Sequence, residues 1–293
     1  GSFDILFAGR PIRIAIDAGN GMGGHTAPAV MAKINAVVDG IYFELDGTFP
    51  NHEANPIEAK NLVDLQKLVR TKQADIGLAF DGDADRCFLV DEKGDLVSPS
   101  ALTALIAERE LKKNPGSSII YNLICSRAVP EIIQENGGVA LRSRVGHSFI
   151  KKMMAEHDAI FGGEHSGHFY FKDFWNADSG MLAALHAIAA LFDEQKPLSE
   201  LMKRFNKYSL SGEINTRVED PKAAIAQIKD EFSKSSEKVE FDELDGLTVS
   251  SLHWSFNVRP SNTEPLLRLN VEAVSVDERL RVQDLVLRIL RSG

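Results

Sequence analysis

The sequence predicts an α/β protein: two consecutive three-layer α/β units with mixed sheets, then a smaller α+β domain with an antiparallel sheet covered by two helices. Three observations lead to this prediction. Short apolar runs alternate with helical stretches up to about residue 205. Asn114-Pro115-Gly116 is a breaker cluster. From Ser209 onward the sequence becomes rich in strand patterns. We therefore expect three domains, at residues 1–114, 115–208 and 209–293.

The first domain reads as a β-α-β unit followed by a helix and a strand pair. Its predicted strands are 12–16, 41–45, 76–80 and 87–90, and its predicted helices are 27–34, 58–71 and 100–113. The second domain repeats this alternation. Its predicted strands are 119–124 and 139–142, with a β segment interrupted at 162–167, and its predicted helices are 129–136, 148–157, 178–194 and 198–205.

The last domain reads as an antiparallel sheet with two helices. Its predicted strands are 212–218, 246–251, 253–259 and 267–274, and its predicted helices are 221–233 and a final amphipathic segment from 276. The strands follow one another closely, which is typical of hairpin connections. We expect both helices to cover the same sheet.

Composition restricts the class of partner. The chain has 293 residues, of which 44% are hydrophobic and 26% charged, and its net charge is -9. That charge repels nucleic-acid backbones, and no basic run or long apolar stretch indicates a nucleic acid or a membrane as a partner. Cys87 and Cys125 lie in apolar runs, which favours buried thiols in a reducing cytoplasm. Any anionic ligand must therefore be held by a local group of basic residues.

The most informative motif is Asp81-Gly82-Asp83-Ala84-Asp85-Arg86, at the exit of a buried strand. A tight turn can point all three carboxylates inward, where they repel one another unless a hard cation binds them. An acidic surface turn is the simpler reading of a lone Asp-x-Asp, but three aspartates in register favour a metal site. Open coordination positions suit Mg²⁺ shared with a phosphoryl oxygen, with Arg86 beside that oxygen.

An EF-hand is the specific alternative, because Glu92 falls at the twelfth position of such a loop. Two features argue against it. The position that requires glycine holds Arg86, and the flanking segments read as strands instead of helices.

A second motif is Arg259-Pro260-Ser261-Asn262-Thr263-Glu264-Pro265, with Arg268 just beyond it. An arginine fork together with hydroxyl, amide and backbone donors is suited to a dianionic phosphate. A polar hairpin loop explains the same composition about equally well.

A third motif is Gly162-Gly163-Glu164-His165-Ser166-Gly167-His168, between two apolar runs. Glycines allow close backbone approach, and Glu164 and Ser166 offer an acceptor and a donor for vicinal sugar hydroxyls. Zinc bound by Glu164, His165 and His168 is an alternative, although the histidines lack helical spacing. Upstream, the segment from Ser143 to Ser148 opens a helix whose N-terminus can face an anion, with Arg144 or His147 as a partner.

A glycine pattern near the start of the chain suggests a different function. Gly19, Gly21 and Gly24 follow a strand and precede a helix, and Glu44 lies at the distance typical of dinucleotide-binding folds. A dinucleotide-dependent oxidoreductase is therefore the more distant alternative. A tight turn between strand and helix explains the same glycines.

Taken together and in this order, the motifs at 81–86, 163–168 and 259–265 closely resemble the α-D-phosphohexomutase family. The segments 17–21 and 46–52 also resemble its phosphomannomutase/phosphoglucomutase branch. The resemblance covers essentially the whole chain. It implies an isomerase that interconverts hexose 1-phosphate and hexose 6-phosphate through a phosphoserine and a bisphosphate, with Mg²⁺ and glucose or mannose 1,6-bisphosphate as cofactor and activator.

The resemblance also implies residue roles. Those implied are Asp81, Asp83 and Asp85 for the metal; Arg86 and His147 for catalysis; and Glu164, Ser166, His168, Arg259, Ser261, Asn262, Thr263 and Arg268 for the hexose phosphate. Two departures stand out. No serine here is followed by His-Asn, so the family's serine loop is absent, and Ile124 stands where a lysine often occurs. We therefore expect domains two to four only, inactive without the N-terminal serine domain, or a non-catalytic sugar-phosphate binding fragment.

Overall fold

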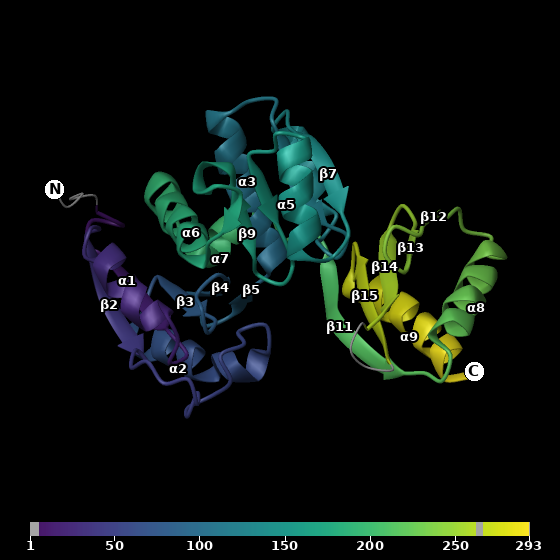
Figure 1. Cartoon of the computed structure of the whole chain (residues 1–293), viewed down its shortest axis with the longest axis horizontal. Helices are drawn as coiled ribbons and strands as arrows, with labels where there is room; N and C mark the ends of the chain where they lie inside the picture. Colours follow the sequence, from purple (N-terminus) through teal and green to yellow (C-terminus); the bar gives the residue numbers. More distant parts are fainter. Residues whose placement is uncertain (1–5, 262–265, 293) are drawn as a thin grey trace. The chain divides into compact units, whose positions relative to one another are not determined.

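A computed structural model describes residues 6–261 and 266–292. The chain divides into two compact units, one formed by Gly1–Leu141 with His147–Asn206 and the other by Arg142–Gly146 with Lys207–Gly293 (Figure 1).

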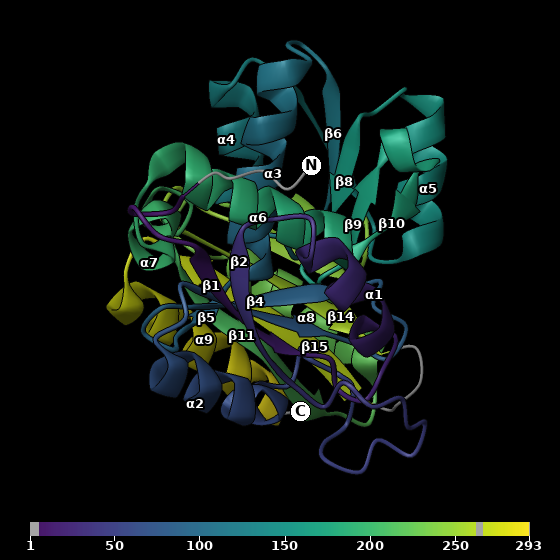
Figure 2. The ribbon, with the colours of Figure 1, turned by 90° about the vertical axis from the view of Figure 1, so that its left-hand side faces the viewer.

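The first unit contains two five-stranded sheets. The strands of the first sheet are β1 (Ile12–Asp17), β2 (Ala36–Ile41), β3 (Ile76–Phe80), β4 (Cys87–Asp91) and β5 (Leu96–Val97). Their order is β2-β1-β3-β4-β5, with β1 parallel to β2 and β3, whereas β4 runs antiparallel to β3 and β5. The helical segments here are α1 (Gly23–Met31), η1 (Ala59–Leu62) and α2 (Val63–Lys72), and α2 runs beside the sheet (Figure 2). All five residues of β3 and of β4 are buried, so the hairpin between them is anchored in the core.

The second sheet has the order β10-β9-β8-β6-β7. Its strands are β6 (Ser118–Asn122), β7 (Val139–Ser143), β8 (Phe161–Gly163), β9 (Phe169–Phe171) and β10 (Ala177–Asp178). Its helices are α3 (Pro99–Lys113), α4 (Ala128–Glu135), α5 (His147–Glu156), η2 (Lys172–Phe174), α6 (Gly180–Glu194), α7 (Leu198–Leu201) and η3 (Met202–Arg204). Helix α6 contacts β3 and β4 of the first sheet as well as α3. Residues from both sheets of this unit therefore share one continuous apolar core.

The second unit has an antiparallel sheet in the order β11-β15-β14-β13-β12. Its strands are β11 (Ser209–Arg217), β12 (Glu240–Asp242), β13 (Leu247–Ser250), β14 (Trp254–Pro260) and β15 (Leu266–Ala273). Helices α8 (Pro221–Ser233) and α9 (Val276–Ser292) contact each other and pack on this sheet (Figure 1). Side chains from both helices and the sheet share one core, so this unit has a hydrophobic interior of its own.

The predicted fold class is confirmed, but several element bounds were wrong. The first α/β crossover ends in β2 at 36–41 instead of 41–45, because Tyr42 takes a left-handed φ of 55° that ends the strand. The apolar run 41–45 led to this error. The short strands β5 and β12 were not predicted at all. In the part of the chain that the structure describes, no helix combines the length and apolar character needed to cross a bilayer.

Candidate functional site

The three aspartates lie on the hairpin loop that joins β3 to β4. The strands pair up to Phe80 and Cys87, so the loop starts and ends on neighbouring buried strands. One carboxylate oxygen from each of Asp81, Asp83 and Asp85 lies within 4.8 Å of the other two. The structure therefore brings together the three residues that the sequence suggested as metal ligands.

The electrostatics of this loop fit a divalent cation. Burial, followed by the charges of Asp81, Asp83 and Asp178, raises the pKa of Asp85 to about 7. The buried Oδ1 of Asp85 has no hydrogen-bond donor among the described residues. Because a buried anionic oxygen without a donor is unfavourable, converging carboxylates of this kind suit a hard cation such as Mg²⁺.

The EF-hand alternative does not fit the structure. Both segments that flank the loop are strands, as expected from the sequence. Glu92, which would be the twelfth ligand of such a loop, instead accepts hydrogen bonds from the backbone N–H and the hydroxyl of Ser199. The acidic cluster thus belongs to a β-hairpin and not to a helix-loop-helix calcium site.

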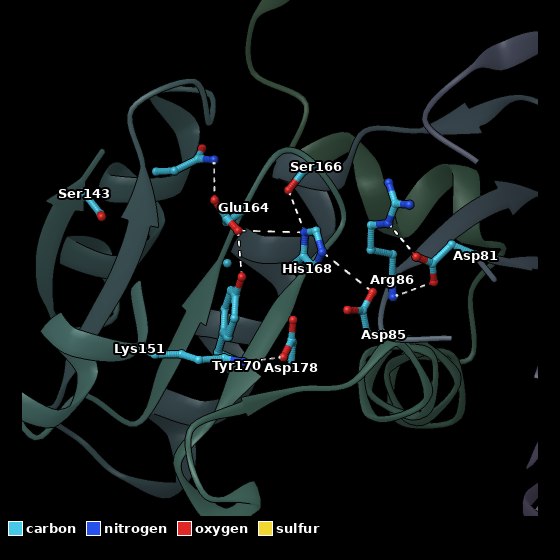
Figure 3. Close-up of polar contacts among 12 residues, drawn as sticks. Asp81, Asp85, Arg86, Ser143, Lys151, Glu164, Ser166, His168, Tyr170 and Asp178 are labelled. Atoms are coloured by element: carbon cyan, nitrogen blue, oxygen red, sulfur yellow. Dashed lines mark hydrogen bonds and ion pairs between the residues drawn. The ribbon is translucent and has the colours of Figure 1, made fainter. Parts of the chain in front are cut away.

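Arg86 is the last residue of the loop 81–86 between β3 and β4, which we call the metal loop after its predicted ligands. Its backbone N–H donates to Asp81 Oδ1 at 3.0 Å and its Nε–H donates to Asp81 Oδ2 at 2.7 Å (Figure 3). Its Nη1 donates to the side-chain oxygen of Asn55 at 3.2 Å. The guanidinium is therefore held from two sides next to the carboxylate cluster.

The predicted sugar-binding residues Glu164, Ser166 and His168 lie on the turn 164–168 between β8 and β9, which we call the sugar turn. Glu164 is 2% exposed, and its two oxygens accept from Asn122 Nδ2 at 3.2 Å and from the Tyr170 hydroxyl at 2.7 Å. Ser166 Oγ lies 2.9 Å from His168 Nδ1. These contacts fix the direction of the Glu164 carboxylate.

His168 connects the sugar turn to the metal loop. Its Nε2 lies 3.6 Å from Asp85 Oδ1 and its Nδ1 lies 3.8 Å from Glu164 Oε2 (Figure 3). Burial lowers the pKa of His168, against the opposing effect of Glu164. The backbones also join, because Arg86 and His168 form an antiparallel bridge and Cys87 N–H donates to the Gly167 carbonyl at 3.2 Å. The metal loop and the sugar turn are thus joined directly by backbone hydrogen bonds.

The zinc alternative is not supported. His165 turns to Ser100, whose Oγ lies 3.0 Å from its Nδ1, and burial lowers the pKa of His165. Within residues 6–261 and 266–292, the side chains grouped closely enough to share a metal ion are Asp81, Asp83 and Asp85, and also Asp85, His168 and Asp178. Neither group contains Glu164 or His165.

Besides Asn55, sequence reasoning missed four residues of this site. Asn122 and Tyr170 hold Glu164, and Asp178 contributes to the second acidic group, where Lys151 pairs with it at 2.9 Å. Tyr170 stands between Phe169 and Phe171 in the sequence, so a lone hydroxyl in an apolar strand was the available signal. For Asn122, Lys151 and Asp178 the sequence carries no comparable signal. His147 is exposed at the first residue of α5.

The second unit carries the predicted phosphate-binding residues. Arg259 and Arg268 lie opposite each other on β14 and β15. The Glu213 carboxylate forms salt bridges with both arginines, at 3.1 Å from Arg259 Nη2 and 3.3 Å from Arg268 Nη1. Burial lowers the pKa of Arg259, and Glu213 opposes that effect. Ser261 Oγ accepts from Arg268 at 3.4 Å. Asn262 and Thr263 lie outside the described residues.

The two arginines retain donors for an anion. The Nε atoms of Arg259 and Arg268 are buried and have no hydrogen-bond acceptor among residues 6–261 and 266–292. Buried guanidinium donors that lack an acceptor favour an anionic ligand. Glu213 reaches the pair because β11 has a register shift between Leu210 and Glu213, where Gly212 takes a left-handed φ of 69°.

The glycines that suggested a dinucleotide serve packing within the first sheet. A Cβ on Gly21 would lie 2.5 Å from the Gly82 carbonyl oxygen, and one on Gly24 would lie 2.2 Å from the Phe43 carbonyl oxygen. Met22 N–H donates to that same Gly82 oxygen at 2.9 Å. Gly21 thus lets the β1–α1 turn approach the metal loop closely, and Gly24 lets α1 approach Phe43.

Comparison with known proteins follows the same division of the chain. Three family models match: phosphoglucomutase/phosphomannomutase α/β/α domain II over residues 5–94, α/β/α domain III over 98–208, and the C-terminal domain over 213–289. The chain belongs to the phosphoglucomutase/phosphomannomutase family. The domain III match includes α3, whereas our division at residue 114 placed that helix in the preceding domain.

Individual relatives agree with this assignment. A phosphomannomutase of Methanocaldococcus jannaschii is 45% identical over 264 residues, which are 89% of this chain and 57% of that protein. A phosphomannomutase of Salmonella typhimurium is 40% identical over 269 residues, 90% of this chain and 59% of that protein. The chain thus spans a little under three fifths of the length of these curated relatives.

Solved structures show the same fold. A phosphoglucomutase/phosphomannomutase family protein from Burkholderia thailandensis has a TM-score of 0.86 at 32% identity, over 99% of this chain and 62% of that one. The N-acetylphosphoglucosamine mutase of Aspergillus fumigatus, solved with GlcNAc-6P and magnesium, has a TM-score of 0.58 at 17% identity, over 96% of this chain and 66% of that one. The second likeness concerns the fold alone.

Proposed function

We propose that this chain provides the metal, sugar and phosphate sites of a phosphohexomutase that interconverts hexose 1-phosphate and hexose 6-phosphate through a phosphoserine and a bisphosphate. The observation that carries the proposal is the joined metal loop and sugar turn, where Arg86 and His168 bridge and Asp85 lies 3.6 Å from His168. Relatives named phosphomannomutase support this substrate class.

The proposal gives Asp81, Asp83 and Asp85 the role of Mg²⁺ ligands. A relative in fold was solved with magnesium, and the unsatisfied oxygen of Asp85 suits such an ion. Bound there, Mg²⁺ would neutralise charge on a transferring phosphoryl group. Arg86 would donate to an oxygen of the same group, because its guanidinium is held beside the carboxylates.

The remaining residues would recognise the two ends of the sugar phosphate. Glu164, fixed by Asn122 and Tyr170, would accept from a sugar hydroxyl, and Ser166 would donate to its neighbour. His168, whose pKa is lowered by burial, would be neutral at pH 7 and able to accept a proton. Arg259, Ser261, Asn262, Thr263 and Arg268 would hold the phosphate that is not being transferred, and His147 remains a proposed cleft residue.

No serine in this chain is followed by His-Asn. We therefore propose that the phosphoryl-carrying serine belongs to a further domain of the same polypeptide and that this chain alone binds sugar phosphate without turnover.

Cys87 and Cys125 are buried and free, and burial raises the pKa of both thiols, which suits a reducing cytoplasm.

Calorimetric titration with glucose 1,6-bisphosphate tests the proposal. We expect binding that requires Mg²⁺ and weakens in Asp83→Asn, together with no mutase turnover in a coupled assay. NAD(H) serves as the comparison ligand for the oxidoreductase alternative. Binding of NAD(H) but not of the bisphosphate would contradict the proposal, and turnover by the chain alone would contradict the role given to a further domain.

A further inference from the structure

The segment between β2 and η1, residues 42–58, forms a strap over the end of the first sheet. Its sequence includes Asp46-Gly47-Thr48-Phe49-Pro50-Asn51-His52, a motif to which the proposed chemistry gives no task. The strap has no regular secondary structure, yet several side-chain hydrogen bonds fix it. A long irregular segment that is held in place so well needs a physical reason.

Two contacts anchor the strap to the β1–α1 turn. His52 Nε2 lies 2.9 Å from Oδ2 of Asp17, the last residue of β1, which is 1% exposed. His52 Nδ1 lies 2.9 Å from the Glu53 carbonyl oxygen. Asn51 Nδ2 donates to Asn20 Oδ1 at 2.8 Å. Both ring nitrogens of His52 therefore face oxygens, and one of these oxygens belongs to the buried Asp17 carboxylate.

Beyond this anchor the strap reaches the metal loop. The Phe49 ring lies beside this loop, because a Cβ built on Gly82 would be 3.4 Å from the ring. Three residues past His52, the Asn55 side-chain oxygen accepts from Arg86 Nη1 at 3.2 Å. Asn61 Nδ2 in turn donates to the Asn55 carbonyl oxygen at 2.9 Å, which fixes the backbone there.

Asn55 differs in kind from the other partner of Arg86. Asp81 accepts from the Arg86 backbone and from its Nε, but it is also a proposed metal ligand, so its carboxylate is shared. Asn55 is neutral and accepts from Arg86 through its amide oxygen. It therefore holds the Nη1 end of the guanidinium without neutralising its charge.

We propose that Asn55, placed by the His52–Asp17 anchor, is a positioning residue that aims the Arg86 guanidinium at the phosphoryl group. The inference rests on the proposed function in one respect, the phosphoryl contact of Arg86. A guanidinium with a free Nη1 end rotates among several rotamers, and fixing it before the ligand arrives lowers the entropy lost on binding.

The test is a double-mutant cycle on the chain, in which glucose 1,6-bisphosphate is titrated at saturating Mg²⁺. Arg86→Ala removes the phosphoryl contact, and we expect affinity to fall about tenfold to a hundredfold. Asn55→Ala removes one hydrogen bond to the guanidinium, and we expect a loss of about three- to tenfold. In the Arg86→Ala background the same Asn55→Ala change should alter affinity by less than about twofold.

Thr48→Ala is the matched control within the strap, because the Thr48 side chain bonds only to Asp46 in the described structure. It should bind like the unmodified chain. His52→Gln should weaken binding in the same direction as Asn55→Ala, and this effect should also vanish without Arg86. Thermal melting checks that each variant is folded.

A readout without ligand completes the design. The ¹⁵Nη–¹Hη resonances of Arg86, assigned by their loss in Arg86→Lys, should exchange faster with water in Asn55→Ala than in Thr48→Ala, because Asn55 accepts from Nη1. Equal exchange in these variants, or an Asn55→Ala chain that binds normally while Arg86→Ala binds weakly, would overturn the positioning role alone. Normal binding by Arg86→Ala would instead overturn the phosphoryl contact in the proposed function.

Discussion

The affinity of the metal loop for Mg²⁺ should depend on pH through Asp85. Its pKa of about 7 in the metal-free protein arises first from burial and then from Asp81, Asp83 and Asp178. Mg²⁺ binds the deprotonated carboxylate, so protons and metal compete for it. At pH 8 about nine tenths of the Asp85 carboxyls are ionised, whereas at pH 6 only about one tenth are. The apparent affinity should therefore fall about tenfold between pH 8 and pH 6.

Calorimetry can measure both consequences of this competition. Titrations at pH 6 in two buffers of different ionisation enthalpy should show release of about one proton per bound ion, against about one tenth of a proton at pH 8. Asp85→Asn should bind Mg²⁺ more weakly and lose most of the pH dependence. Asp46→Asn is the matched control, because Asp46 lies outside the metal loop and hydrogen bonds from Thr48 lower its pKa.

The same shift has a consequence for stability. A carboxyl whose folded pKa is raised contributes stability below its unfolded pKa near 3.8, and this contribution is lost as pH rises through about 7. The metal-free chain should therefore gain more in melting temperature from Mg²⁺ at pH 8 than at pH 6. An affinity that is flat between these pH values, or equally steep in Asp85→Asn, would refute the reasoning.

Two further substitutions test the supports of the site. A Cβ on Gly180 would lie 2.5 Å from the Arg86 carbonyl oxygen and 3.0 Å from that of Ala84, so Gly180→Ala should displace the metal loop and weaken Mg²⁺ binding by about tenfold to a hundredfold in a titration. Gly47→Ala, where a Cβ meets nothing within 4 Å, should bind normally, and equal affinities would contradict this role for Gly180. Tyr170→Phe leaves the buried Glu164 short of a donor and should lower the free energy of unfolding by about 1–3 kcal/mol in urea. Tyr42→Phe, whose hydroxyl bonds to Asp64 at an exposed position, should lower it by less than about 1 kcal/mol, and similar losses in both variants would speak against the support of Glu164.

The sequence could predict the grouping of the three aspartates because they are local. Asp81, Asp83 and Asp85 alternate with small residues directly after a buried strand, so the chain itself brings their carboxylates together. The same holds for Glu164 and Ser166, which share one turn. Fold class was predictable for a related reason, since strand and helix patterns are local and their alternation limits the possible topologies.

Partners supplied from elsewhere in the chain could not be predicted. Asn55 reaches Arg86 across 31 positions, and Glu213 reaches Arg259 across 46. Neither residue belongs to a local sequence pattern. The role of Asn55 depends on the path of the strap, and that of Glu213 depends on the irregularity in β11, and only the folded backbone defines these two features. The glycines at 19–24 show the opposite case, since a local pattern suggested a dinucleotide but its cause is close packing against Gly82 and Phe43.

Each arginine of the proposed phosphate contacts already has an acidic partner. Arg86 is paired with Asp81, and Arg259 and Arg268 share Glu213. A phosphate would therefore compete with a carboxylate instead of meeting a bare cation, and its net gain in free energy would be smaller than the charge count suggests. Under the proposed function, this smaller gain in binding free energy is an advantage. A bisphosphate that must release either end and rebind in the reverse orientation needs contacts strong enough to select phosphate but weak enough to exchange it.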